Sequence, residues 1–134
     1  MKILNQSQIQ EADRQTILME PIESIDLMER AAKTCFKWIC QRYNMDQKFT
    51  LLCGTGNNGG DGLALYRMLR QKKYSCTLFE FALGKIPSND YNRNKSKVPK
   101  KNFKELIPES LSKIQKDEVI IDALLGTGLN RPVE

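Results

Sequence analysis

The chain has 134 residues, with 21 lysines and arginines against 16 aspartates and glutamates, and it contains no histidine. This length allows one domain, and the absence of histidine excludes Ser-His and Cys-His nucleophilic sites within the chain. The 4 cysteines form no C-x-x-C pair, so we expect buried, reduced thiols of a cytoplasmic protein rather than a zinc site. No run approaches membrane-spanning length and no signal-peptide core is present, so no membrane association is predicted.

Two helices are expected near the N-terminus, over residues 7–17 and from about residue 24 onward. Ser24 or Asp26 can cap the second helix. Its apolar residues recur at steps of three and four: Met28, Ala31, Ala32, Cys35, Phe36, Ile39 and Tyr43. Such a stripe is typical of a helix that packs on a core, and the alternative is a dimer face that would include Trp38.

Strands and helices alternate in the rest of the chain. The predicted strands are residues 49–53, 76–81 and 119–122, and the predicted helices are residues 60–72 and 103–113. A polar, proline-punctuated loop is expected at residues 84–101, and the last helix can restart at Pro108. This order predicts an α/β fold, namely a Rossmann-like three-layer αβα arrangement with a mostly parallel sheet and two N-terminal helices.

Much of the excess positive charge lies in one stretch of the chain. It is carried by Arg93, Lys95, Lys97, Lys100, Lys101 and Lys104. A nucleic-acid-binding patch is one interpretation, but only Tyr91 and Phe103 are interleaved as aromatic residues. A solvated loop is favoured instead, and no nucleic-acid partner is expected.

A glycine-rich segment follows the first predicted strand. Residues 53–62 read Cys-Gly-Thr-Gly-Asn-Asn-Gly-Gly-Asp-Gly. Glycine permits a positive φ and lets the backbone approach a ligand closely. A turn of this kind from strand to helix directs backbone N–H groups and the positive end of the helix dipole at one place. The segment therefore predicts binding of an anionic group, most often a phosphate.

The spacing of this segment narrows the kind of nucleotide site. Gly54, Gly56 and Gly59 match the G-x-G-x-x-G pattern of dinucleotide-binding turns. Glu80 lies about as far along the sequence from this segment as the ribose-binding carboxylate of dinucleotide-binding turns. The alternative is that Glu80 is a solvated residue at a strand end. The Lys-Ser/Thr of a Walker A motif is missing, which argues against phosphate transfer from a nucleoside triphosphate. A tight turn without any ligand is the remaining alternative.

A second polar segment follows the last predicted strand. Asp122 ends the β-branched run Val119–Ile121, and Gly126-Thr127-Gly128 comes soon after. In open parallel sheets, ligands bind just beyond the carboxyl ends of the strands. We therefore expect both glycine-rich segments at one edge of the sheet, with Asp61 and Asp122 facing the same crevice.

Leu52–Gly62 and Ile121–Pro132 together closely resemble the YjeF N-terminal domain family, the NAD(P)H-hydrate epimerases. The stretch around Ala12-Asp13 and the residues Leu27–Ala32 are also similar to that family. The resemblance implies an isomerase that interconverts the R and S epimers of hydrated NADH and NADPH (NADHX and NADPHX) at nicotinamide ring carbon 6. This is a metabolite-repair step, and it serves an ADP- or ATP-dependent NAD(P)H-hydrate dehydratase.

The resemblance also implies site residues and an ion. The substrate-binding residues would be Asn57, Asn58, Gly59, Gly60, Asp61, Gly126, Thr127, Gly128, Leu129, Asn130, Arg131 and Pro132. A potassium ion would be held by Asn58 and Asp122. Asp122 is also the first candidate for the catalytic acid–base group, with ion binding alone as its alternative role. Asp61 is expected to hold loop N–H groups or a ribose hydroxyl, and a homodimer is expected.

One segment of the family pattern is absent from this sequence. The family normally continues to an Asp-x-Pro-Ser-Gly segment, which supplies a further substrate carboxylate and a serine ligand for potassium. This sequence ends at Glu134, so residues 1–134 are expected to form a single YjeF N-terminal-like domain that is incomplete at its C-terminus. The alternative functions are a non-catalytic nucleotide-binding or dimerising scaffold module, or an inactive fragment of the epimerase.

Overall fold

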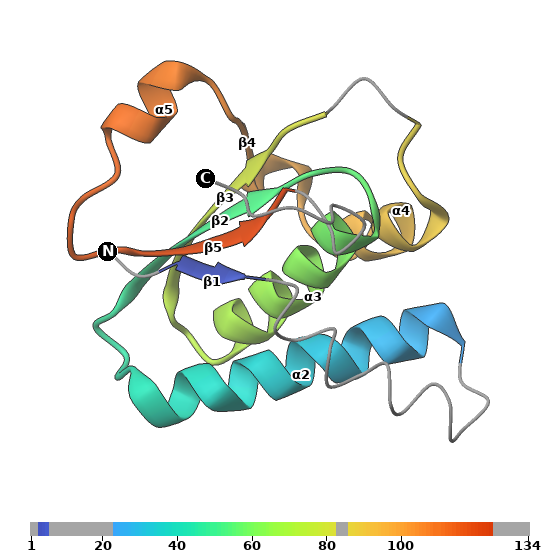
Figure 1. The fold of residues 1–134 in the computed structure, drawn as a ribbon, viewed down its shortest axis with the longest axis horizontal. Helices are drawn as coiled ribbons and strands as arrows, with labels where there is room; N and C mark the ends of the chain where they lie inside the picture. Colours follow the sequence, from blue (N-terminus) through green and yellow to red (C-terminus); the bar gives the residue numbers. More distant parts are fainter. Residues whose placement is uncertain (1–2, 6–22, 83–85, 125–134) are drawn as a thin grey trace.

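The computed structural model describes residues 3–5, 23–82 and 86–124 (Figure 1). The elements in chain order are β1 (Ile3–Asn5), α2 (Ser24–Arg42), β2 (Lys48–Cys53), α3 (Asn57–Gln71), β3 (Ser75–Glu80), α4 (Asn89–Lys95), the 3-10 helix η1 (Lys100–Asn102), β4 (Phe103–Glu105), α5 (Pro108–Ser112) and β5 (Val119–Ala123). Within these residues the strands form one 5-stranded sheet in the order β1-β5-β2-β3-β4. Every neighbouring pair is parallel, which confirms the predicted parallel α/β fold.

The centre of the sheet is β2, which pairs with β5 on one side and β3 on the other. Its alternate residues Phe49, Leu51 and Cys53 are completely buried and belong to the hydrophobic core. Matching core positions come from β3, β5, α2 and α3. Burial of a large apolar side chain of this kind stabilises the fold by about 1.5–3 kcal/mol.

The helices α2 and α3 lie side by side beneath this face of the sheet (Figure 1). The buried residues of α2 are Met28, Ala31, Ala32, Cys35 and Ile39, so the core-packing interpretation of its apolar stripe is confirmed. Trp38 is partly buried against the same core, with the Arg42 guanidinium 4.0 Å from the centre of its ring. The predicted cap is wrong, because α2 already begins at Ser24 and its N-cap residue Glu23 makes no capping side-chain bond.

The opposite face of the sheet borders α5. A cavity of about 270 Å³ lies between residues of α5, such as Ser110, and the strand residues Thr50, Thr77 and Phe79. Helices thus flank both faces, as a three-layer αβα arrangement requires. The predicted restart of a helix at proline is confirmed, because Pro108 is the first residue of α5.

Two predicted segments differ from the structure. The expected loop at residues 84–101 contains α4 and η1, because the Ser88 hydroxyl caps α4 by accepting a bond from the Tyr91 N–H at 3.1 Å. The expected helix over residues 103–113 is wrong in its first part. There Phe103–Glu105 forms β4, which pairs with β3.

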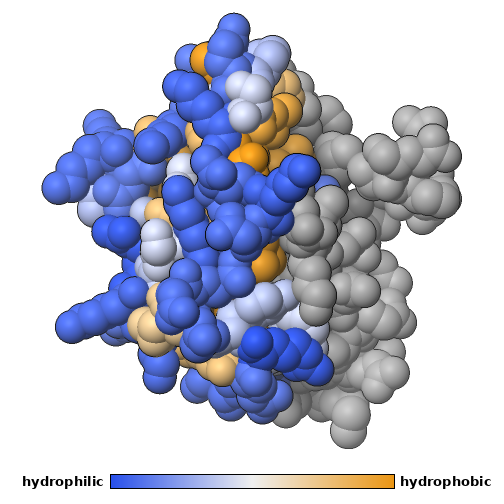
Figure 2. Space-filling view, turned by 90° about the vertical axis from the view of Figure 1, so that its left-hand side faces the viewer, coloured by the Kyte–Doolittle hydropathy of each residue, from blue (hydrophilic) through white to orange (hydrophobic). Residues whose placement is uncertain are grey.

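The edge strand β1 was not predicted from the sequence, and it pairs with β5 over three residue pairs. The predicted helix at residues 7–17 lies outside the described residues. On the side of the molecule shown in Figure 2, hydrophilic residues cover most of the described surface, and apolar residues appear only in small, separate patches. Among the helices that the structure describes, none is both long and apolar enough to cross a membrane.

Asn94 ties three helices together, and its loss is expected to be costly. This fully buried residue of α4 accepts a bond from Arg67 of α3 at 2.8 Å, and its amide lies 3.0 Å from the Met28 sulfur of α2. Arg67 also pairs with Glu29 of α2. We expect Asn94→Ala to lower the free energy of unfolding by about 2 kcal/mol or more, because it leaves a cavity and removes a partner of Arg67.

Urea unfolding followed by circular dichroism measures this effect. The matched control is Asn92→Ala, since Asn92 is an exposed residue of the same helix. Equal urea midpoints for the two variants would contradict a stabilising role of the Asn94 network.

Candidate functional site

The carboxyl ends of β2 and β5 meet at one edge of the sheet. Leu52 lies opposite Asp122 in the strand register, and the N–H of Gly54 donates to the carbonyl of Ala123 at 3.0 Å. The predicted convergence of the two polar segments is therefore confirmed as far as Leu124. The other predicted binding residues, from Gly126 to Pro132, lie outside the described residues.

The helix α3 begins at Asn57, three residues earlier than predicted. Asn57–Asp61 therefore form the first turns of a helix rather than an irregular loop, and the first α-helical bond runs from the Gly60 N–H to the Gly56 carbonyl at 3.0 Å. The first N–H groups of any α-helix have no intrahelical acceptor, and the helix dipole adds positive potential there. The N-terminal end of α3 thus suits an anionic group.

The glycines around this helix start allow close backbone packing. A Cβ on Gly59 would lie 1.8 Å from the carbonyl oxygen of Gly54. A Cβ on Gly54 would lie 2.5 Å from the carbonyl oxygen of Leu124. No glycine of the segment has a φ in the left-handed region, so the expected use of positive φ is wrong. Gly56 differs from the others, because no atom lies within 4 Å of a Cβ at that position. Its exposed backbone leaves space for a ligand.

Asp122 lies at this edge with its carboxylate held in place. Its Oδ1 accepts a bond from the N–H of Leu124 at 3.0 Å, and the residue is half-buried. Burial, with added contributions from the charges of Glu80 and Asp122, raises the pKa of the Cys53 thiol far above its ordinary value. Glu80 lies opposite Cys53 in the pairing of β2 with β3, and Asp122 lies opposite the neighbouring Leu52 in the pairing of β2 with β5. Asp61 is only 5% exposed, which favours a role in holding groups of the protein itself.

Glu80 ends β3 and is bound by α4. The Tyr91 hydroxyl donates to its carboxylate, and Lys95 forms an ion pair with it at 3.0 Å. Burial first, and then the hydrogen bond and charge of Glu80, raise the pKa of Tyr91, which keeps this donor protonated. Glu80 thus has a role that neither sequence interpretation foresaw, because it fixes α4 beside the site.

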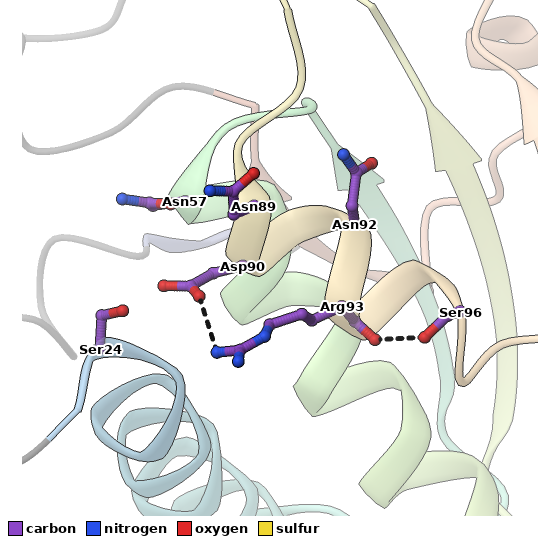
Figure 3. Close-up of a pocket in the computed structure, with 7 residues that line it drawn as sticks. All are labelled: Ser24, Asn57, Asn89, Asp90, Asn92, Arg93 and Ser96. Atoms are coloured by element: carbon purple, nitrogen blue, oxygen red, sulfur yellow. Dashed lines mark hydrogen bonds and ion pairs between the residues drawn. The ribbon is translucent and has the colours of Figure 1, made fainter.

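An open cavity of about 810 Å³ borders the N-terminal end of α3 (Figure 3). It is lined by Ser24, Asn57, Asn89, Asp90, Asn92, Arg93 and Ser96. The side chains of α4 were missed as site residues because their segment was predicted to be a loop. The pattern of Ser88 followed by the acidic Asp90 in the first turn is the signal that could have located this helix.

Comparison with known proteins gives the family. Residues 24–134 match the family model described as the YjeF-related protein N-terminus. The chain belongs to the YjeF-related N-terminal family. The glycine-rich edge described above is therefore the candidate site of a YjeF-related domain.

Relatives of this YjeF-related domain carry informative names. The chain is 36% identical over 140 residues to a bifunctional NAD(P)H-hydrate repair enzyme Nnr of Coxiella burnetii. This match covers all of this chain and 27% of that protein. It is 31% identical over 129 residues to an NAD(P)H-hydrate epimerase of Limosilactobacillus fermentum, covering 96% of this chain and 61% of that protein. A relative from Anaerococcus prevotii with the same epimerase name is 32% identical.

A crystal structure of the yeast protein ynu0 has the same fold. It superposes with a TM-score of 0.68 at 22% identity and covers all of this chain and 60% of that one. At this identity the likeness concerns the fold alone. The YjeF-related domain thus spans about a quarter of the bifunctional relatives and about three fifths of the epimerases it matches.

The side chains expected to hold potassium have suitable donor chemistry. Carboxylate and amide oxygens are ligands of hard cations, and Asp122 and Asn58 of the YjeF-related domain supply both types. Within the described part of the chain, no group of three or more His, Cys, Asp or Glu residues is placed to hold a metal ion.

The thiols of the YjeF-related domain are expected to resist alkylation. Burial raises the pKa of Cys35 and of Cys76 from 9.0 to about 12, and the pKa of Cys53 is raised as well. At pH 8 a thiol with such a pKa is ionised to roughly one part in 10⁴, and only the thiolate reacts. We expect mass spectrometry after brief iodoacetamide treatment to find these three thiols unmodified in the folded chain. Denatured chain should be labelled at all 4 cysteines, and rapid labelling of folded Cys53 would refute this expectation.

Proposed function

We propose that this chain is an NAD(P)H-hydrate epimerase domain that interconverts the R and S epimers of NADHX and NADPHX. The observation that carries the proposal is the meeting of the N-terminal end of α3 with Asp122 at one edge of the parallel sheet. Relatives named NAD(P)H-hydrate epimerase, which the chain covers over about three fifths of their length, support this choice.

The proposed substrate lies across the glycine-rich edge. The N-terminal end of α3 would bind the pyrophosphate, because backbone N–H groups and the helix dipole favour an anion there. The open space beside Gly56 would let the substrate approach the backbone closely. Asn57, Asn58 and the segment Gly126–Pro132 complete the proposed substrate-binding residues.

The proposed chemistry is a reversible loss and return of water at ring carbon 6. The hydroxyl group is protonated, and the electron pair of the ring nitrogen expels it as water. An iminium-like ring remains. The Asp122 carboxyl group would transfer that proton to the departing hydroxyl. The resulting carboxylate would then accept a proton from the water that adds to the other face of the ring. This step restores both the hydrate and the starting form of Asp122.

We propose that Asn58 and Asp122 hold a potassium ion in the complete site. When bound, the ion would supply positive charge that orients substrate oxygens beside the reacting carbon. The Leu124 N–H bond to Asp122 Oδ1 would direct the other carboxylate oxygen away from the strand. A functional link to an NAD(P)H-hydrate dehydratase is part of the same proposal, since the Coxiella burnetii relative is named a bifunctional repair enzyme. We also propose that the chain forms a homodimer.

The test is epimerisation by this chain. Purified R-form NADHX is mixed with the folded protein, with and without potassium, and both epimers are followed by chromatography. We expect equilibration faster than in the protein-free control, with a further increase when potassium is present. No acceleration by a chain that circular dichroism shows to be folded would contradict the proposal. Binding of NADHX without any acceleration would favour the alternative of a non-catalytic nucleotide-binding module.

A further inference from the structure

The cavity beside α4 extends the candidate site beyond the glycine-rich edge. It shares Asn57 with the start of α3, and its other walls come from α4 and from Ser24 at the start of α2. Figure 3 shows Asp90 and Arg93 projecting from α4 toward the side where Ser24 lies, with Asn57 and Asn89 close by. The volume of about 810 Å³ is in the range of pockets that hold ligands as large as half a dinucleotide.

Among the described residues that line this cavity, Arg93 carries the positive charge. Its guanidinium lies 3.7 Å from the Asp90 carboxylate, which is the acidic group it contacts among the described residues. This distance is longer than a direct hydrogen bond, and the Arg93 side chain is 57% exposed while that of Asp90 is 12% exposed. A guanidinium carries five N–H donors in a fork that fits phosphate oxygens. Asp90 therefore orients Arg93 and leaves most of its donors for a ligand.

The chemistry of the lining selects one part of a dinucleotide. Every described residue that lines the cavity is Ser, Asn, Asp or Arg. An adenine ring is usually held by apolar or aromatic surfaces, whereas phosphate and ribose are held by polar groups. The cavity thus fits a sugar-phosphate better than a base.

The wall that carries Arg93 is held rigidly. Glu80 binds Tyr91 and Lys95, and Asn94 of the same helix is bound by Arg67. Rigid support of this kind reduces the entropy lost when a ligand binds. Arg93 is therefore a positive side chain on a fixed helix, placed beside the start of α3 where it can bind an anion.

We propose that this cavity binds a phosphate group of the adenosine half of the substrate, and that Arg93 is its binding residue. The proposal rests on the proposed function, because it assumes a dinucleotide whose nicotinamide half lies at Asp122. The phosphate is either part of the pyrophosphate or the 2′-phosphate of NADPHX. In the second case Arg93 would set a preference for NADPHX over NADHX.

Isothermal titration calorimetry with two probes, ADP-ribose and 2′-phospho-ADP-ribose, distinguishes binding of the pyrophosphate from binding of the 2′-phosphate. Arg93→Gln should weaken binding by about 10-fold, because it removes charge-assisted hydrogen bonds to phosphate. Loss of affinity for both probes would assign Arg93 to the pyrophosphate, and loss for the 2′-phosphorylated probe alone would assign it to the 2′-phosphate. The matched control is Lys97→Gln, which removes the same charge from an exposed position that does not line the cavity.

Three results would overturn the subsite. These are unchanged binding in Arg93→Gln, an equal loss in Lys97→Gln, or no binding of either probe by the wild-type chain. The epimerisation assay separates this failure from failure of the proposed function. Catalysis with KM values for NADHX and NADPHX that Arg93→Gln leaves unchanged would refute the subsite alone. Binding of the probes that depends on Arg93, in a chain without epimerase activity, would refute the catalytic function alone.

Discussion

Asp122→Asn is expected to lower the rate of epimerisation by at least about 100-fold while substrate binding persists. Asparagine has nearly the same shape as aspartate, and its carbonyl oxygen can still accept the bond from the Leu124 N–H that Asp122 Oδ1 accepts at 3.0 Å. The strand end therefore keeps its conformation. The group that is lost is the carboxyl that we propose as donor and acceptor of the proton at ring carbon 6. The kcat and KM for NADHX, measured separately, check this expectation.

Asp117→Asn is the matched control for this experiment. Asp117 is exposed in the turn before β5, at the other end of the strand from Asp122. This variant carries the same chemical change and should keep the wild-type kcat. Wild-type turnover in Asp122→Asn would contradict the proposed acid–base role. Partial recovery of that variant at high potassium would instead assign Asp122 to ion binding alone.

Gly59→Ala is expected to lower the free energy of unfolding by about 3 kcal/mol or more. The added Cβ would lie 1.8 Å from the carbonyl oxygen of Gly54, and 3.2 Å from the Tyr91 ring. The nearest atom belongs to the backbone and cannot rotate away, so the start of α3 would have to move from the end of β2. A loss of this size is a large part of the total stability of a typical domain. Urea unfolding followed by circular dichroism measures it.

Gly56→Ala is the control for the same chemical change. No atom lies within 4 Å of a Cβ at Gly56, so the packing is undisturbed. Gly56 is the N-cap residue of α3, and alanine at an N-cap costs only about 1 kcal/mol or less relative to glycine. Similar urea midpoints for the two variants would show that the close approach of Gly59 to Gly54 is unimportant.

The elements that were foreseen from the sequence carry local signals. The strands β2, β3 and β5 are short apolar or β-branched runs, and the stripe of α2 has a helical period that its buried face reproduces. The elements that were missed depend on contacts distant in the chain. The short strands β1 and β4 are defined by pairing with β5 and β3. Polar α4 is held by the bonds from Tyr91 to Glu80 and from Arg67 to Asn94.

The same distinction holds for the candidate site. Asn57 and Asp122 are predicted as site residues because they belong to recognisable segments at predicted strand ends. The cavity around Arg93 was not identified, because it requires α4 to fold back beside the start of α3. No periodicity within residues 84–101 indicates this placement. The reason for the glycines was also hidden in the sequence, since the atoms that Gly54 would meet belong to Leu124.

A map of where NADHX binds tests the proposed site at the glycine-rich edge most directly. A titration of ¹⁵N-labelled chain with NADHX, followed by two-dimensional NMR, reports each backbone N–H separately. We expect the largest shift changes on the N–H groups from Gly54 to Asp61 and on those of Ala123 and Leu124. Changes centred instead on α5, or no changes at millimolar substrate, would contradict a hydrated-dinucleotide site at the meeting of β2, β5 and α3.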